Sequence, residues 1–226
     1  MTDSKKLARI TGLIYLVVVI TGILSLAYIP KQLIDWKNGE STLHNLLANE
    51  QLFRIGIGLH VICYLAFLAL GLAFYRLLHH VNQSFARVML VLVLVSIPIS
   101  FINLQNKYDV LRILEIARNQ SEANHAIQIM HQLSSYNDGI LIVSIFWGLW
   151  LFPLGFLLYR TNQFPKVLSV LLMLGCVTYL INYFGNTLII NYKSLGFPSY
   201  LSMVSGIAEI GTCIWLIIFG FKQKPN

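Results

Sequence analysis

Residues 140–158 read ILIVSIFWGLWLFPLGFLL. This stretch has no charged side chain and, wound as a helix, is apolar around its whole circumference. A helix of a water-soluble domain would instead pair an apolar stripe with a polar face. Since about 20 such residues cross the hydrocarbon core of a bilayer, the stretch predicts a transmembrane helix.

Five further blocks have the same character, and hydrophobic residues make up 57% of the 226-residue chain against 11% charged. The first block follows Lys5, Lys6 and Arg9, as a secretory signal would. Its apolar run is longer than the usual 7–15 residues of a signal, so we expect a retained helix. We predict an all-α, polytopic membrane protein that forms a single six-helix domain over residues 1–226. The predicted spans are about 10–29, 53–78, 88–104, 139–159, 167–189 and 200–219.

The net charge of +7 is unevenly distributed. With the N-terminus inside, the inner segments hold nine Lys or Arg residues against Asp3 alone, whereas the outer segments hold seven of each sign. Lys and Arg concentrate on short cytoplasmic loops of membrane proteins. We therefore predict that both termini are cytoplasmic. Because the positive net charge is explained by the membrane topology, we expect no nucleic-acid partner.

Two outer segments are too long for simple turns. Residues 30–51 predict a short helix that begins near Ser41 as its N-cap. Residues 105–137 contain no Pro or Gly and continue the helical spacing of the third and fourth spans, with a break at 119–121. We expect an outer helical hairpin that extends these spans. It is either a lid over an outward cavity or an amphipathic pair resting on lipid headgroups.

Polar residues inside the spans point to a site. A charged side chain at the bilayer centre costs about 2.5–3.5 kcal/mol, so it needs a partner or a purpose. Glu209 is predicted near the middle of the last span. It is either a proton, cation or ligand site, or a carboxyl that is protonated or hydrogen-bonded to a neighbouring helix. The other polar groups lie mostly in the outer halves of their spans, which predicts an outward-facing polar crevice. Its candidate ligand-binding residues are Arg54, His60, Asn103, Asn182, Asn186 and Glu209.

Enzymatic and cofactor chemistry is less favoured. The sequence lacks HExxH, GxSxG, P-loop and GxGxxG motifs. His60 is the one histidine clearly within a span, too few for bis-histidine haem, and His60 with Cys63 supplies only two zinc ligands. We therefore assign no catalytic residue, no metal site and no cofactor.

Seven segments spread over nearly the whole chain carry a further signal. They are KLARITGLIY (6–15), LFRIG (52–56), FWGLW (146–150), GFLLYR (155–160), FPKVL (164–168), GCVTYL (175–180) and EIGTCIWLIIFG (209–220). Together they resemble a bacterial family of multi-pass membrane proteins known as domain of unknown function 4386. The resemblance implies a six-helix protein of the bacterial inner membrane. The family offers no established activity or catalytic residues to transfer.

Two functional hypotheses follow from these patterns. In the first, the protein binds or transports a small molecule or ion through the polar crevice. In the second, it is a non-catalytic membrane scaffold or subunit that acts through its outer hairpin. A membrane-embedded enzyme is a third, weaker alternative. The expected partners are the lipid bilayer and a small-molecule or ion ligand, and the sequence does not indicate an oligomeric state.

Overall fold

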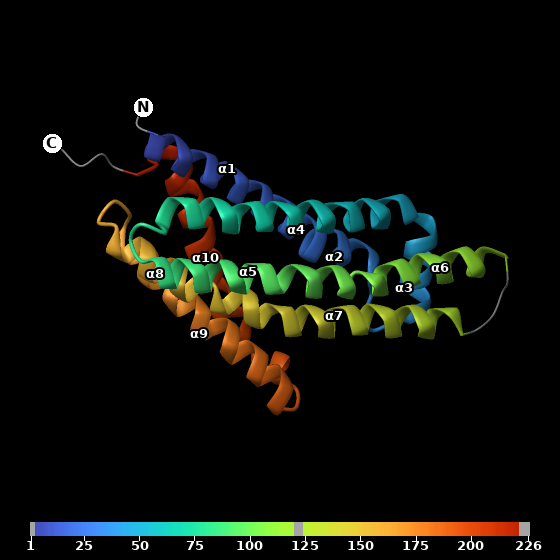
Figure 1. Cartoon of the computed structure of the whole chain (residues 1–226). Helices are drawn as coiled ribbons and strands as arrows, with labels where there is room; N and C mark the ends of the chain where they lie inside the picture. Colours follow the sequence, from blue (N-terminus) through green and yellow to red (C-terminus); the bar gives the residue numbers. More distant parts are fainter. Residues whose placement is uncertain (1–2, 120–123, 222–226) are drawn as a thin grey trace. The chain divides into compact units, whose positions relative to one another are not determined.

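The computed structural model describes residues 3–119 and 124–221, and every regular element in them is helical (Figure 1). The fold class predicted from the apolar blocks is therefore confirmed. The elements are α1 (Asp3–Ile23), the π-helix η1 (Leu24–Tyr28), α2 (Ile29–Leu33), α3 (Gly39–Ala48), α4 (Glu50–Leu78), α5 (Gln83–Asn103), α6 (Gln105–Asn119), α7 (His125–Leu149), α8 (Leu151–Arg160), α9 (Lys166–Leu188), the 3₁₀ helix η2 (Tyr192–Leu195) and α10 (Phe197–Ile218).

In the described part of the chain, six helical stretches are long and apolar enough to cross a membrane. Each contains one of the six predicted blocks or nearly all of it. Apolar side chains such as Leu13 and Leu65, each 53% exposed, cover their outward faces, as expected of helices that contact lipid. The stretches are Ser4–Leu33, Glu50–Leu78, Gln83–Asn119, His125–Arg160, Lys166–Leu188 and Tyr200–Ile218.

The third and fourth stretches are longer than the predicted spans because they include the expected helical hairpin. α6 follows α5 after Leu104, and α7 runs without interruption from His125 into the fourth span. The predicted break begins where α6 ends, at Asn119, whereas its positions 120 and 121 lie outside the described residues. α6 and the first half of α7 lie side by side (Figure 1).

The short helix α3 begins two residues earlier than predicted, and Ser41 is not its N-cap. The cap is Asn38, whose Oδ1 accepts a hydrogen bond from the Ser41 backbone N–H at 3.0 Å. Asparagine has an extended backbone here and satisfies a first-turn donor as well as serine would.

The described chain forms two compact units. Unit 1 comprises Met1–Val17, Ala66–Ile97 and Ile142–Asn226, and unit 2 comprises Val18–Leu65 and Pro98–Leu141. Helices α1, α4, α5 and α7 each contribute one part to each unit.

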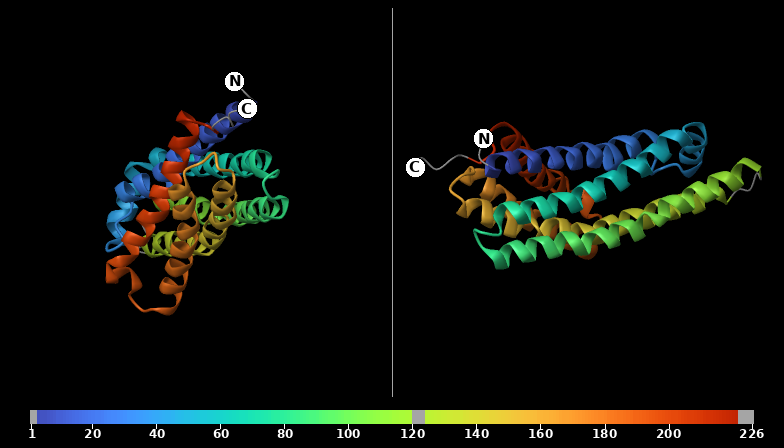
Figure 2. Two further views of the ribbon diagram at one scale, coloured as in Figure 1. Left: turned by 90° about the vertical axis from the view of Figure 1, so that its left-hand side faces the viewer. Right: turned by 45° about the horizontal axis from the view of Figure 1, so that its top comes forward.

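Unit 1 is built around aromatic side chains and close helix contacts. The Trp150 ring lies 5.0 Å from that of Phe67 and 6.3 Å from that of Tyr15. α9 packs against both α8 and α10, and it is joined to α10 through η2 (Figure 2). In that connection Asn191 and Gly196 have φ angles of 59° and 76°, which turn the chain back.

Unit 2 has its own hydrophobic core, shared by α2, α3, α4, α6 and α7. Leu46 of α3 is fully buried in it, and Leu43 and Leu47 pack against it. This core holds the hairpin helices at fixed positions next to the polar residues of α4. Its members are Ile29, Leu33, Leu46, Phe53, Ile57, Leu104, Val110, Leu111, Leu114, Ile129, Leu133 and Tyr136.

Candidate ligand-binding sites

Glu209, on α10, accepts hydrogen bonds from two tyrosine hydroxyls of unit 1. The Tyr15 hydroxyl of α1 donates to Oε2 at 3.1 Å. The Tyr179 hydroxyl of α9 donates to Oε1 at 3.4 Å. The carboxyl therefore links the first, fifth and sixth spans.

Two hydrogen bonds offset the cost of placing the Glu209 carboxylate within a span. A hydrogen bond to a charged group contributes about 1.5–3 kcal/mol. Two such bonds match the cost of about 2.5–3.5 kcal/mol for a charged side chain at the bilayer centre. None of the described residues forms a salt bridge with Glu209, and its side chain is partly exposed. The two tyrosine hydroxyls are therefore its hydrogen-bond partners, and no described cationic side chain neutralises it.

Asn182 and Asn186, also in unit 1, are engaged in the α9–α10 connection. The Asn182 amide donates to the Ser202 hydroxyl at 3.1 Å and accepts from the Tyr192 hydroxyl at 3.0 Å. The Asn186 amide donates to the Asn182 backbone carbonyl at 2.7 Å. Both side chains therefore have structural partners at the end of α9.

His60, in unit 2, is fully buried and bonded through both ring nitrogens. Nδ1 lies 2.8 Å from the Gly56 carbonyl oxygen, and Nε2 lies 2.6 Å from the Tyr136 hydroxyl. Because a carbonyl only accepts, Nδ1 carries the hydrogen, and in the neutral ring Nε2 accepts from Tyr136. Asn103, another predicted residue, donates to the Tyr136 backbone carbonyl at 2.9 Å. Tyr136 thus brings His60 and Asn103 together.

Lys107, in the first turn of α6, is buried in the same region of unit 2. Its side chain is 4% exposed, and its Nζ lies 4.3 Å from the Tyr136 ring centroid and 5.8 Å from that of Phe53. Across the described residues it forms no salt bridge. Burying an ammonium costs several kcal/mol, whereas a desolvated cation–π contact returns about 2 kcal/mol. The two aromatic contacts therefore offset only part of the cost of burying Lys107 in its charged form.

Arg54, the remaining predicted residue, forms an ion pair in unit 2. Its Nε lies 2.7 Å from Glu50 Oε1, and Arg118 Nη2 lies 2.6 Å from Glu50 Oε2. The Glu50 side chain is 13% exposed, and those of the arginines are 52% and 54% exposed. This pairing ties the start of α4 to the last turn of α6.

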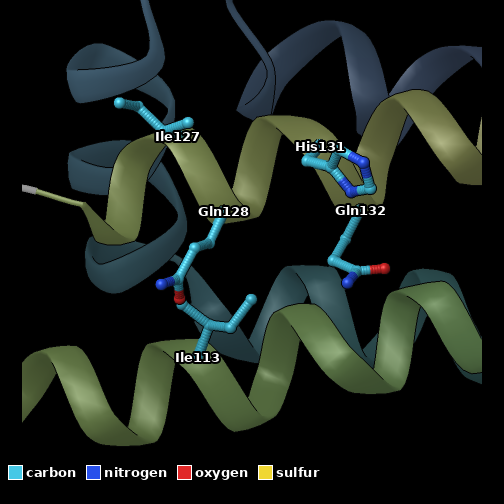
Figure 3. A pocket seen from close by; sticks show the side chains of 5 residues that line it. All are labelled: Ile113, Ile127, Gln128, His131 and Gln132. Atoms are coloured by element: carbon cyan, nitrogen blue, oxygen red, sulfur yellow. The ribbon is translucent and has the colours of Figure 1, made fainter.

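A hollow of about 350 Å³ lies between α6 and α7, lined by Ile113, Ile127, Gln128, His131 and Gln132 (Figure 3). The Gln128 and Gln132 side chains extend from α7 toward α6, on which Ile113 lies. None of the residues predicted to bind a ligand lines it.

A family model described as "Domain of unknown function (DUF4386)" matches residues 10–220, nearly the entire chain. The chain belongs to the DUF4386 family. This DUF4386 protein is also similar to an uncharacterised protein of Archaeoglobus fulgidus, with 28% identity over 97 residues. That match covers 43% of this chain and only 56% of the archaeal protein. No solved structure matches.

Several residues at these sites of the DUF4386 protein were not predicted from its sequence. Tyr15 and Tyr179 lie well inside spans, where a hydroxyl requires a partner. Lys107 could have been found by its spacing, because with Val110, Leu111 and Leu114 it occupies the buried face of α6. Tyr136 carries no such signal.

Proposed function

We propose that this multi-pass membrane protein binds or transports a small molecule or ion, and that Glu209 is its central binding residue. The observation that supports this is the Glu209 carboxyl, which lies within a span, is held by two tyrosine hydroxyls and has no cationic partner among the described residues. Tyrosine donors orient a carboxylate without neutralising it. A proton or a small cation would complete the site.

The proposal includes a location and an orientation. The proposed location, the bacterial inner membrane, follows from the resemblance to the family. Both termini are proposed to be cytoplasmic, because the segments on that side carry the excess of Lys and Arg. Ligand enters from the outer side, since most polar residues within the spans are predicted in their outer halves.

The decisive experiment compares Glu209→Gln with Glu209→Asp in proteoliposomes. Proton flux is followed with an entrapped pH-sensitive dye, and Na⁺ and K⁺ binding is followed as a shift in melting temperature. We expect Glu209→Gln to abolish the wild-type response while Glu209→Asp retains part of it. Thr212→Val is the matched control, because this buried hydroxyl on the same helix donates to the Ala208 carbonyl and not to Glu209. If Glu209→Gln and Glu209→Asp lose the wild-type response equally, Glu209 has only a structural role.

A scaffold function is the second candidate, and the hairpin supports it. Ile116 on α6 is 49% exposed, and Ile127 on α7, which lines the hollow between the two helices, is 70% exposed. This candidate predicts that Glu209→Leu is tolerated, whereas Ile116→Ser with Ile127→Ser abolishes partner capture by cross-linking in native membranes. The opposite pattern favours ligand binding.

A further inference from the structure

Unit 2 contains a buried lysine, Lys107, that forms no ion pair with any described residue. The Lys107 ammonium lies against the Tyr136 and Phe53 rings, and its side chain is almost wholly buried. The acidic groups that form ion pairs in unit 2 are already engaged. Glu50 pairs with two arginines and Asp109 pairs with Arg112, and none of the described residues pairs with Lys107.

Hydrogen bonds fix the Tyr136 ring against which this ammonium lies. The Tyr136 ring beneath it carries the hydroxyl that meets His60 Nε2, and Asn103 fixes the Tyr136 backbone. The Asn106 amide, one residue before Lys107, donates to the backbone and side-chain oxygens of Asn103, both at 3.0 Å. Helices α4, α5, α6 and α7 thus hold the site rigidly from several sides.

We propose that Lys107 anchors a second ligand site, which takes the carboxylate or phosphate group of a small organic molecule or a lipid. The aromatic rings stabilise a charged ammonium only in part, and an anionic oxygen of the ligand would pair with it directly. The Phe53 and Tyr136 rings beside the ammonium belong to the hydrophobic core, which favours a ligand with an apolar body next to its acidic group. This site lies in unit 2 and does not depend on the function proposed for Glu209, which lies in unit 1.

A purely structural lysine accounts less well for this arrangement. Lys31 and Lys37 of the same unit are exposed, as lysines usually are unless their charge is paired, and Lys107 departs from this pattern. A lysine that only filled space would also be replaceable by methionine or leucine on the buried face of α6.

The test is ¹⁹F NMR of two probes, 4-fluorobenzoate and monofluorophosphate, added to the full chain in phosphatidylcholine nanodiscs. We expect one or both probe signals to broaden on the wild-type protein. Lys107→Met should weaken binding at least tenfold, and Lys37→Met, which changes an exposed lysine, should not. If Lys107→Met fails to fold, Lys107→Arg should retain binding while Lys107→Gln loses it.

The lipid composition identifies the source of the acidic group. If the natural ligand is an anionic lipid, phosphatidylglycerol in the nanodisc displaces the probe; if it is a soluble acid, the probe stays bound. Absence of broadening on folded wild-type protein, or equal broadening on Lys107→Met, overturns the proposal. A Glu209 variant that loses its proton-flux or cation response should leave the ¹⁹F probe signals unchanged. The two proposals can therefore be contradicted independently.

Discussion

Tyr15 and Glu209 stand 194 residues apart in sequence and are joined by a 3.1 Å hydrogen bond. The bond connects α1 to α10 within unit 1, and Tyr179 of α9 adds a longer bond to the same carboxyl. One carboxyl within a candidate membrane span therefore links α1, α9 and α10 by hydrogen bonds.

Tyr15→Phe should destabilise the protein more than Tyr179→Phe does. A hydrogen bond to a charged group contributes about 1.5–3 kcal/mol, and the Tyr15 bond to the Glu209 carboxyl is the shorter of the two. Thermal unfolding in detergent measures the difference. Tyr183→Phe, which changes a tyrosine of the same helix as Tyr179, is the control and should have little effect. Equal melting temperatures for wild type and Tyr15→Phe would show that the bond contributes nothing.

The fold was more predictable from the sequence than the sites were. A span is a local property, since about 20 apolar residues suffice to identify it. Glu209 is conspicuous for the same reason, as a charge in an apolar run. Its tyrosine partners depend on how each helix is rotated about its axis, which hydropathy does not specify. Lys107 falls just beyond the predicted third span, and only the packing of α6 shows that it is buried.

His60 and Tyr136 should be energetically coupled. Tyr136→Phe leaves the buried Nε2 of His60 without its partner, and His60→Phe leaves the Tyr136 hydroxyl unpaired. Each change should cost about 1–3 kcal/mol. The double variant should cost clearly less than the sum, because removing both partners leaves no unsatisfied group. A double-mutant cycle on unfolding free energies measures this coupling, and additive costs would contradict it.

Gly155→Ala should destabilise unit 1, whereas Gly206→Ala should be neutral or stabilising. A Cβ at Gly155 would lie 2.6 Å from the Ser169 carbonyl oxygen of α9, and this backbone cannot move without separating the helices. No atom lies within 4 Å of a Cβ at Gly206, where alanine gains up to about 1 kcal/mol of helix propensity. Melting temperatures of the two variants should shift in opposite directions, or Gly155→Ala alone should fall. Tolerance of both would mean that α8 and α9 pack less closely.

Labelling of introduced cysteines tests the predicted orientation. The native Cys63, Cys176 and Cys213 are buried, so they give little background with a membrane-impermeant maleimide. Lys37→Cys, in an exposed segment predicted to be outer, should react in intact cells. His80→Cys, in an exposed turn predicted to be inner, should react only after the membrane is disrupted.

The energetic reason for this orientation is the charge distribution, because translocating the Lys- and Arg-rich segments is disfavoured. If the labelling pattern is reversed, both termini lie outside. The polar halves of the spans then face the cytoplasm, and ligand would reach Glu209 from the inner side. The labelling experiment therefore decides from which side of the membrane a substrate of the Glu209 site should be supplied in the flux assay.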